Sequence, residues 1–231
     1  MAVGCLELAN KHRAIRVNTA TATATAAPTA RDAALNETDL TLRDGSKVRV
    51  RRVRASDEQS LLTFLLRLSE QSRLLRFFSA GANLAAQAHG FADVDGISAY
   101  GLVATAASTG EIVGHAGYAR VGPQTAEVAF AIADAYQGLG LATTLLARLA
   151  LHAHAHRIAT FTAVTRTDNH AMIDVFRESG FAVELRSGVD IVNVRFPTRL
   201  SADGWCRFEQ RDQSARGGSQ PAVPARAGHA A

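Results

Sequence analysis

The sequence predicts an α/β fold in which helices pack on a mixed β-sheet. Two observations favour this class. Three apolar segments with short turns between them, residues 99–108, 111–122 and 125–132, are typical of three antiparallel strands that follow one another. A helix over about 139–157, a strand over 160–166 and a helix over 169–180 come next, and two strands around Val183 and Val192 close the pattern.

The first part of this region has its own patterns. Val48 and Val50 alternate with Arg49 and Arg51, which predicts a half-buried strand better than a nucleic-acid-binding stripe. Asp57 is in position to cap a helix over residues 58–69, and five leucines between residues 61 and 68 supply its apolar side. A second short helix is expected through "LLRFF". These helices precede the three strands and complete the order of elements.

The two ends of the chain differ from its middle. Residues 17–34 form an Ala/Thr-rich repeat with few large apolar side chains, and the segment after residue 200 is rich in Gly, Pro, Ser and Arg. Such segments have little apolar surface to bury, so folding them gains little. We therefore expect a disordered arm over 1–38, one folded domain over 39–200 and a disordered tail over 201–231.

Composition limits the function further. The formal net charge of +4 over 231 residues does not demand a nucleic-acid partner. Cys5 and Cys206 are the two cysteines, too few for a disulfide framework or a cysteine metal cluster. No stretch has the roughly 20 apolar residues that a membrane span needs, and the N-terminus lacks the apolar centre of a secretory signal. A cytoplasmic protein with neither nucleic acid nor membrane as its partner is expected.

Two glycines, Gly138 and Gly140, lie between the third predicted antiparallel strand, residues 125–132, and the predicted helix over about 139–157. A phosphate-binding P-loop would need a following Lys, and the dinucleotide fingerprint would need a third glycine and an acidic residue about 20 positions later. Neither is present. The pattern that remains is Gln137, two residues, Gly140, one residue, Ala142. Small residues there either permit a tight turn or leave the first helical N–H groups open to a pyrophosphate.

This loop resembles the acyl-CoA loop of the GNAT superfamily of N-acetyltransferases. The segments "AEVAFAIADAYQGLGLATTLL" and "NHAMIDVFRESGFAV" carry the resemblance, which covers about residues 41–198. The segments "TLRDGSKVRVRRVRASDE" and "LSEQSRLLRFFS" are similar, more narrowly, to bacterial protein-lysine acetyltransferases that act on acyl-CoA synthetases. The resemblance implies a mostly antiparallel central sheet with helices on both faces, acetyl-CoA as co-substrate, no metal, and a protein acceptor such as an acyl-CoA synthetase.

The resemblance also implies which residues contact acetyl-CoA. Most of them belong to the third strand, the glycine loop and the first turn of the helix that follows. The implied set is Phe130, Ala131, Ile132, Gln137, Gly138, Leu139, Gly140, Leu141, Ala142, Thr143, Asn169 and Phe176.

Glu127 is the candidate general base. Along its strand Val128, Phe130 and Ile132 share one bulky face, whereas Glu127 shares the other face with small alanines. A lysine acceptor, with a free pKa near 10.4, must lose a proton before it attacks a thioester. The alternative is an outward polar residue on a strand, and the resemblance favours the base because relatives use an acid there.

Two residues of the following helix matter for the chemistry. Asn169 either hydrogen-bonds the pantetheine or is simply a helix N-cap. Phe176 departs from the pattern, because many family members carry a tyrosine there that protonates the leaving thiolate. Either water replaces that acid, or the chemistry is slow or absent.

Other titratable residues allow competing interpretations. His152 and His156 share one helix face without an acidic or cysteine ligand, which predicts a solvated helix end and no metal site. His115 either borders the cleft or is an ordinary core or surface histidine. Arg73 and Arg76 either hold an acidic acceptor surface or are helix-surface charges.

The sequence thus predicts an acetyl-CoA-dependent N-acetyltransferase that acts on an amine, most consistently a protein lysine, by direct attack. Small amines are the rival acceptors within the same class of enzyme. A catalytically silent acyl-CoA-binding regulatory module is the rival from another class, and the absence of a tyrosine at position 176 leaves this alternative open.

Overall fold

The computed structural model describes residues 37–201, 204, 206 and 210. Nearly all of the predicted arm and tail lie outside the described residues. The described chain begins one residue before its first strand, which starts at Thr38, within the predicted arm.

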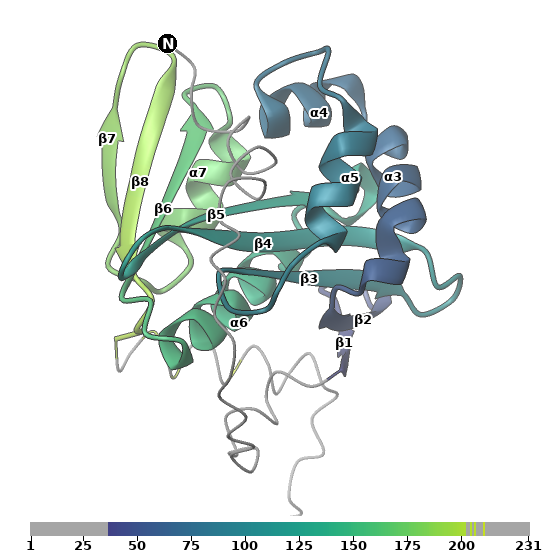
Figure 1. Ribbon diagram of the computed structural model, residues 1–231, viewed down its shortest axis with the longest axis horizontal. Helices are drawn as coiled ribbons and strands as arrows, with labels where there is room; N and C mark the ends of the chain where they lie inside the picture. The colour runs from purple at the N-terminus through teal and green to yellow at the C-terminus, as the bar shows by residue number, and fades with distance from the viewer. Residues whose placement is uncertain (1–36, 202–203, 205, 207–209, 211–231) are drawn as a thin grey trace, which may run out of the picture.

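Within the described residues, the strands form one eight-stranded sheet in the order β1-β2-β3-β4-β5-β6-β8-β7 (Figure 1). The strands are β1 (Thr38–Thr41), β2 (Lys47–Arg52), β3 (Ala99–Ala106), β4 (Ile112–Gly122), β5 (Thr125–Ile132), β6 (Thr160–Arg166), β7 (Glu184–Ser187) and β8 (Ile191–Pro197). All neighbouring strands pair antiparallel except β5 and β6, which are parallel. The mixed, mostly antiparallel sheet predicted from the sequence is confirmed.

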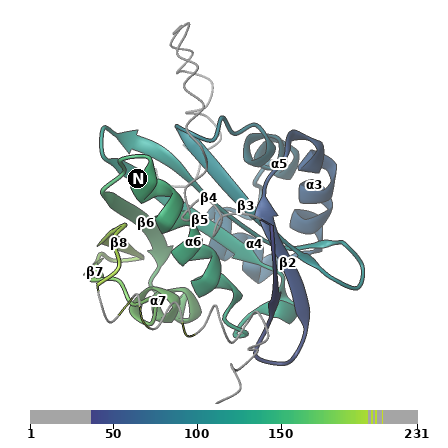
Figure 2. The same ribbon diagram turned by 90° about the horizontal axis from the view of Figure 1, so that it is seen from below.

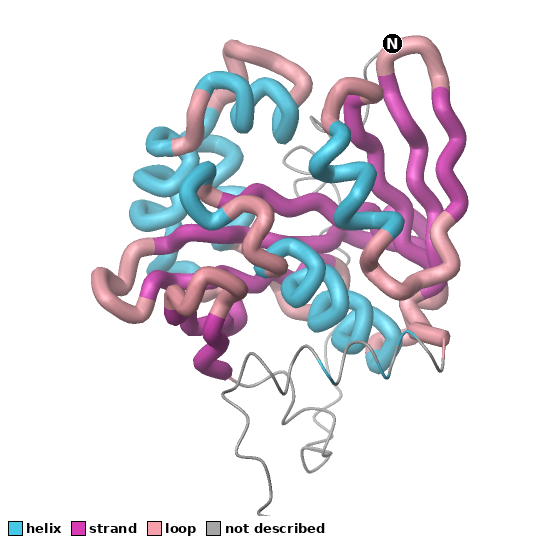
Figure 3. The backbone as a smooth tube through the Cα atoms, turned by 180° about the vertical axis from the view of Figure 1, so that it is seen from behind, coloured by secondary structure: helices cyan, strands magenta, loops and turns pink. Residues whose placement is uncertain are grey.

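Helices cover both faces of the sheet (Figures 1 and 2). They are α3 (Glu58–Arg67), α4 (Glu70–Phe77), α5 (Leu84–Ala92), α6 (Leu141–Ala155) and α7 (His170–Arg177), with short 3-10 turns at Ala55–Asp57 and Asp134–Tyr136. Buried side chains of α3, α4 and α5 form one apolar cluster with the sheet, and those of α6 and α7 belong to a second, larger cluster. Figure 3 shows α6 and α7 in front of the strands from the side opposite to Figure 1.

The periodicity of the sequence located most of these elements. The alternation at Val48 and Val50 is confirmed, because both valines are buried while Lys47 and Arg49 are exposed. Two elements, β1 and α5, were not predicted. The apolar side of α3 is also narrower than expected, since Leu66 is 57% exposed.

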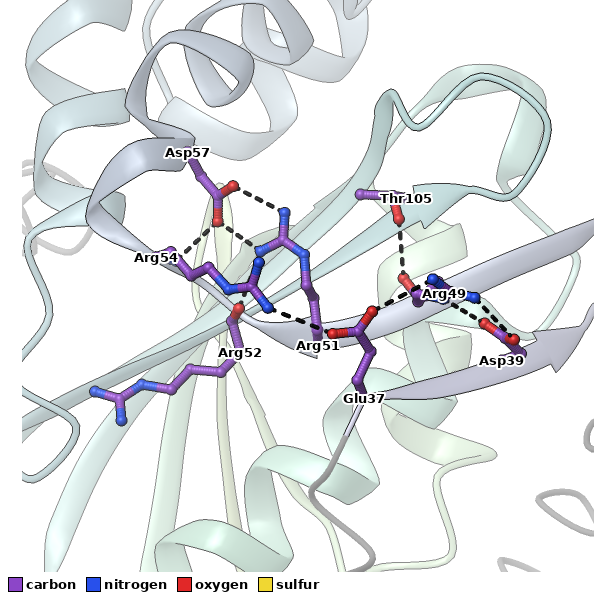
Figure 4. Close-up of polar contacts among 8 residues, drawn as sticks. All are labelled: Glu37, Asp39, Arg49, Arg51, Arg52, Arg54, Asp57 and Thr105. Atoms are coloured by element: carbon purple, nitrogen blue, oxygen red, sulfur yellow. Dashed lines mark hydrogen bonds and ion pairs between the residues drawn. The ribbon is translucent and has the colours of Figure 1, made fainter.

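Asp57 precedes α3 as predicted, but its side chain makes no capping hydrogen bond to that helix. It instead accepts two hydrogen bonds from the Arg51 guanidinium, at 2.7 and 2.8 Å, and one from the Arg54 backbone N–H at 2.8 Å (Figure 4). Burial raises the pKa of this carboxyl, but the bonds from Arg51 and Arg54 outweigh burial and hold the pKa below its ordinary value. The pair ties the end of β2 to the start of α3.

In the part of the chain that the structure describes, no helix is long and apolar enough to cross a membrane. No group of three or more His, Cys, Asp and Glu side chains that could hold a metal ion was found among the same residues.

Candidate active site

A cavity of about 340 Å³ lies where β5 and β6 separate. The parallel pairing of these strands covers only Thr125–Glu127 against Thr160–Thr162. Beyond it, residues 128–132 of β5 and 163–165 of β6 line opposite walls of the cavity. Figure 1 shows β6 and β8 running away from β5 at a steep angle. The edge of β5 that faces β6 is thus left without a strand partner, and its backbone polar groups face the opening.

The β5 wall carries the predicted contacts Phe130, Ala131 and Ile132. All three line the cavity, and all three are at least nine-tenths buried. Phe130 and Ile132 belong to the larger apolar cluster, and Ala131 belongs to the cluster beneath α3 and α5. The predicted alternation of bulky and small faces along this strand is therefore present.

The glycine loop closes one end of the cavity. Gly138 has φ +72° and Gly140 has φ +89°, a left-handed backbone that side chains with a Cβ adopt at a cost. Gly140 is the N-cap of α6 and offers no capping side chain, so the first turn of the helix opens directly onto the cavity. From that turn Leu141, Ala142 and Thr143 are among the lining residues.

Gln137 lines the cavity, and its side chain also fixes the position of the glycine loop through hydrogen bonds. Its Nε2 donates hydrogen bonds to the Ser72 hydroxyl at 3.2 Å and to the Ile132 carbonyl at 3.1 Å. Asp134, three residues earlier, accepts hydrogen bonds from the hydroxyls of Ser69 and Ser72 at 2.7 and 2.6 Å. These contacts fasten the loop to the start of α4, which therefore borders the cavity.

Helix α7 contributes two predicted residues. The Asn169 side-chain oxygen accepts a hydrogen bond from the Met172 backbone N–H at 3.1 Å, so this residue is an N-cap, and it also lines the cavity. Phe176 is 1% exposed and lines the cavity, with its ring 5.8 Å from that of Phe130 and 5.7 Å from that of Phe196. An aromatic ring without a hydroxyl thus forms this part of the cavity wall.

Two predicted residues do not line the cavity. Leu139 packs against the larger apolar cluster instead. Glu127 is half-buried at the last position where β5 pairs with β6, opposite Thr162 and next in the chain to the lining residue Val128. The candidate base therefore lies at the vertex of the opening, the point where β5 and β6 stop pairing and begin to separate.

A second, smaller cavity of about 20 Å³ lies on the α5 side of the sheet. Ala129 and Arg76 line both cavities, so the two adjoin through them. Arg76 is only 8% exposed, and its guanidinium lies 5.3 Å from the centre of the Phe91 ring. Of the two alternatives for Arg76, an exposed charge on the helix surface is therefore excluded.

His115 lines the second cavity and is a buried residue. Its ring stacks on that of Phe91 at 4.2 Å, and its Nδ1 has no hydrogen-bond partner within the described chain. Burial, helped by the charge of Arg76, lowers the pKa of His115 to about 3, so the imidazole is neutral at pH 7.

The prediction of a solvated helix end at His152 and His156 is wrong for His152. Its side chain is 8% exposed, its Nδ1 lies 2.9 Å from the Tyr118 hydroxyl, and its ring stacks on that of Tyr100 at 3.5 Å. Helix α6 packs this histidine against the sheet, a contact that the spacing of residues along the helix does not reveal.

Sequence reasoning missed several lining residues, and three of them come from outside β5, the glycine loop, β6 and α7. Arg43, Ser72 and Leu75 line the main cavity, from the turn between β1 and β2 and from α4. The turn sequence "RDGS" is the single local signal for Arg43, and it predicts a turn without saying what the turn approaches.

Comparisons with known proteins agree with this geometry. A model of the acetyltransferase (GNAT) family matches residues 69–181. Acetyltransferase Pat from Mycolicibacterium smegmatis is 29% identical over 153 residues, which are 65% of this chain and 46% of that protein. The chain thus spans about half the length of this curated relative.

Solved structures show the same likeness. The GNAT domain of S. lividans PAT is 32% identical, with a TM-score of 0.63, over 70% of this chain and 96% of that one. The protein yncA, a putative acetyltransferase from Salmonella typhimurium solved with its cofactor acetyl-CoA, is 18% identical, with a TM-score of 0.52, over 67% and 96% of the two chains. At that identity the second likeness concerns the fold alone.

Proposed function

Because this chain belongs to the acetyltransferase (GNAT) family, we propose that it transfers an acetyl group from acetyl-CoA to an amine, and that the amine is a protein lysine. The observation that carries the proposal is the cavity between the separated strands β5 and β6, which ends at the open first turn of α6. The folded domain over 39–200 would hold this activity, in the cytoplasm, with an acyl-CoA synthetase as one acceptor.

The cavity suits an acyl-CoA. The free edge of β5 offers backbone groups to an extended pantetheine arm, and the partial positive charge at the start of α6 favours a diphosphate. Asn169 and the aromatic ring of Phe176 would border the pantetheine from α7. Backbone N–H groups of β5 would polarise the thioester carbonyl, which makes its carbon more electrophilic.

Glu127 is the proposed general base. The acceptor ammonium gives one proton to this carboxylate, directly or through a water, and the neutral nitrogen then attacks the carbonyl carbon. As the carbon–sulfur bond breaks, the nitrogen gives its second proton to a water molecule and the departing thiolate takes a proton from that same water, while Glu127 returns its proton to the solvent. Water has this role because Phe176 has no proton to give. The position of Glu127 at the vertex of the opening supports its assignment.

The smaller cavity supports an acceptor approach from the α5 side. It adjoins the main cavity at Ala129, which is two residues from Glu127 on the same face of β5. An acceptor lysine that entered through the smaller cavity would reach Ala129, where it would meet the thioester of an acetyl-CoA bound in the main cavity between β5 and β6.

The test is transfer from labelled acetyl-CoA to a purified acyl-CoA synthetase and to a cell lysate. Glu127→Gln should lower turnover by about 100-fold or more while sparing acetyl-CoA affinity. The matched control is Glu184→Gln on β7, where the exposed side chain lies three strands from Glu127 in the sheet order and outside the cavity lining. Unchanged turnover in Glu127→Gln would remove this residue from the mechanism.

The destination of the label separates the candidate functions. Labelled protein supports lysine acetylation, and labelled small molecules would make this a small-amine acetyltransferase. Acetyl-CoA binding without any labelled product would identify a silent regulatory module, the alternative that the missing tyrosine at position 176 leaves open. Absence of acetyl-CoA binding would overturn the proposal altogether.

A further inference from the structure

Arg43 reaches the glycine loop from a turn that lies 95 residues earlier in the chain. The turn between β1 and β2 is held by its own hydrogen bonds, from the Leu42 N–H to the Ser46 carbonyl at 2.8 Å and from the Gly45 N–H to the Leu42 carbonyl at 3.0 Å. Asp44 accepts hydrogen bonds from the Ser46 N–H and hydroxyl at 3.0 and 2.7 Å. A well-defined turn therefore presents Arg43 to the loop.

The contacts between Arg43 and the loop place its guanidinium at the cavity. Its backbone N–H points to the Leu139 carbonyl and its Nη1 points to the Gly138 carbonyl, both at 3.5 Å. Its Nε lies 3.7 Å from the position that a Cβ on Gly140 would occupy. Arg43 also lines the cavity that contains the start of α6.

The charge of this guanidinium is largely unused. The side-chain contact to the Gly138 carbonyl is longer than the 2.7–3.2 Å of a good N–H···O bond, so it holds the guanidinium weakly. Within residues 37–201, no ion pair joins Arg43 to a carboxylate. The first turn of α6 also lacks an acidic residue. The full positive charge of a guanidinium and the partial positive charge of a helix N-terminus thus lie at one end of the cavity.

We propose that Arg43 binds the diphosphate of the acyl-CoA, together with the backbone N–H groups at the start of α6. The inference rests on the proposed function and adds to it a charged contact from outside the glycine loop. It assigns Arg43 to the diphosphate rather than to the 3′-phosphate, because the guanidinium lies beside Gly138 and Gly140, where the loop meets the helix. Arginine suits this role because its planar fork can donate two hydrogen bonds to phosphate oxygens.

The experiment is calorimetric titration of the full chain with CoA and with dephospho-CoA, which lacks the 3′-phosphate and keeps the diphosphate. Arg43→Gln should weaken the binding of both ligands about 10-fold, the low end for a charged hydrogen bond because the site is exposed to solvent. The loss should shrink as salt rises from about 0.05 to 0.5 M. Arg43→Lys should recover part of the affinity, since it keeps the charge without the fork.

Lys47→Gln is the matched control. It removes one exposed positive charge at the other end of the same turn, outside the cavity lining, and should change either affinity less than twofold. Thermal melting of each variant checks that the turn remains folded. Equal CoA affinity in Arg43→Gln and the unmodified chain would overturn this inference alone. A loss confined to CoA would reassign Arg43 to the 3′-phosphate and overturn it as well. If the unmodified chain bound neither CoA nor dephospho-CoA, both the proposed function and the inference about Arg43 would be overturned.

Discussion

Gly140→Gln should separate the two roles of the glycine loop, backbone conformation and space for a ligand. At φ +89° a residue with a Cβ costs about 1–2 kcal/mol, which for a chain of this size lowers Tm by about 2–8 °C. Among the described residues, the new Cβ would have the Arg43 Nε alone within 4 Å, at 3.7 Å, so the side chain would extend into open space at the cavity. We therefore expect at least a 10-fold loss of acetyl-CoA affinity, about 1.4 kcal/mol, in addition to the strain.

Gly110→Gln is the matched control for this variant. Gly110 has φ +73°, and no atom of the residues that the structure describes lies within 4 Å of an added Cβ, but Gly110 lies in the turn between β3 and β4, outside the cavity lining. The two variants should lose similar stability, measured by circular dichroism, while calorimetry should find weaker acetyl-CoA binding only for Gly140→Gln. Equal affinity in both variants would refute the placement of the ligand at the start of α6. An unchanged Tm in both would refute the strain argument.

Three further predictions concern buried polar groups. Asn169→Asp keeps an N-cap for α7, so stability should change by less than about 0.5 kcal/mol, while acetyl-CoA affinity falls because the amide donor is lost. Asp57→Ala should lower the free energy of unfolding by about 3 kcal/mol in urea titrations, since it leaves the partly buried Arg51 without its carboxylate. His115→Phe should remove a loss of stability of about 2 kcal/mol between pH 7 and 5.

The signs of the pH effects follow from the direction in which folding shifts the pKa of His115 and of Asp57. The pKa of His115 is lowered from 6.5 to about 3 on folding, so stability is fully present above pH 6.5 and falls by about 1.4 kcal/mol per unit as the pH drops toward 3. The pKa of Asp57 is lowered from 3.8, so its contribution is present above that value and is lost as the pH falls through the lower folded value. Parallel pH profiles for His115→Phe and the unmodified chain would contradict the first argument.

Two further variants serve as controls for the predictions about Asn169 and Asp57. Asn169→Ala removes the cap and the amide donor together, so it should lose about 1 kcal/mol of stability as well as affinity. If Asn169→Asp bound acetyl-CoA as well as the unmodified chain, Asn169 would be a cap only. An exposed carboxylate provides the comparison for Asp57, because Asp174→Ala on α7 should change stability by less than about 1 kcal/mol.

Local patterns in the sequence were sufficient for most of the elements. Alternation of apolar residues located β2 and β5, and glycines next to a helix pattern marked the loop at Gly138 and Gly140, because periodicity and the demand for a positive φ are properties of neighbouring residues. The short strand β1 and the helix α5 were not predicted. Strand β1 has only four residues, too few to show a period, and the α5 sequence "LAAQAHGFA" has a weak apolar stripe.

The sequence by itself determined which strand faces are apolar, where the chain turns, and that Glu127 shares a face with small side chains. Only the tertiary structure decided that β5 parts from β6 just after Glu127, that Arg43 meets Gly138 across 95 residues, and that His115 and His152 are buried. These features depend on strand register and on packing between distant segments. Many long-range contacts set them together, so no short stretch of residues records them.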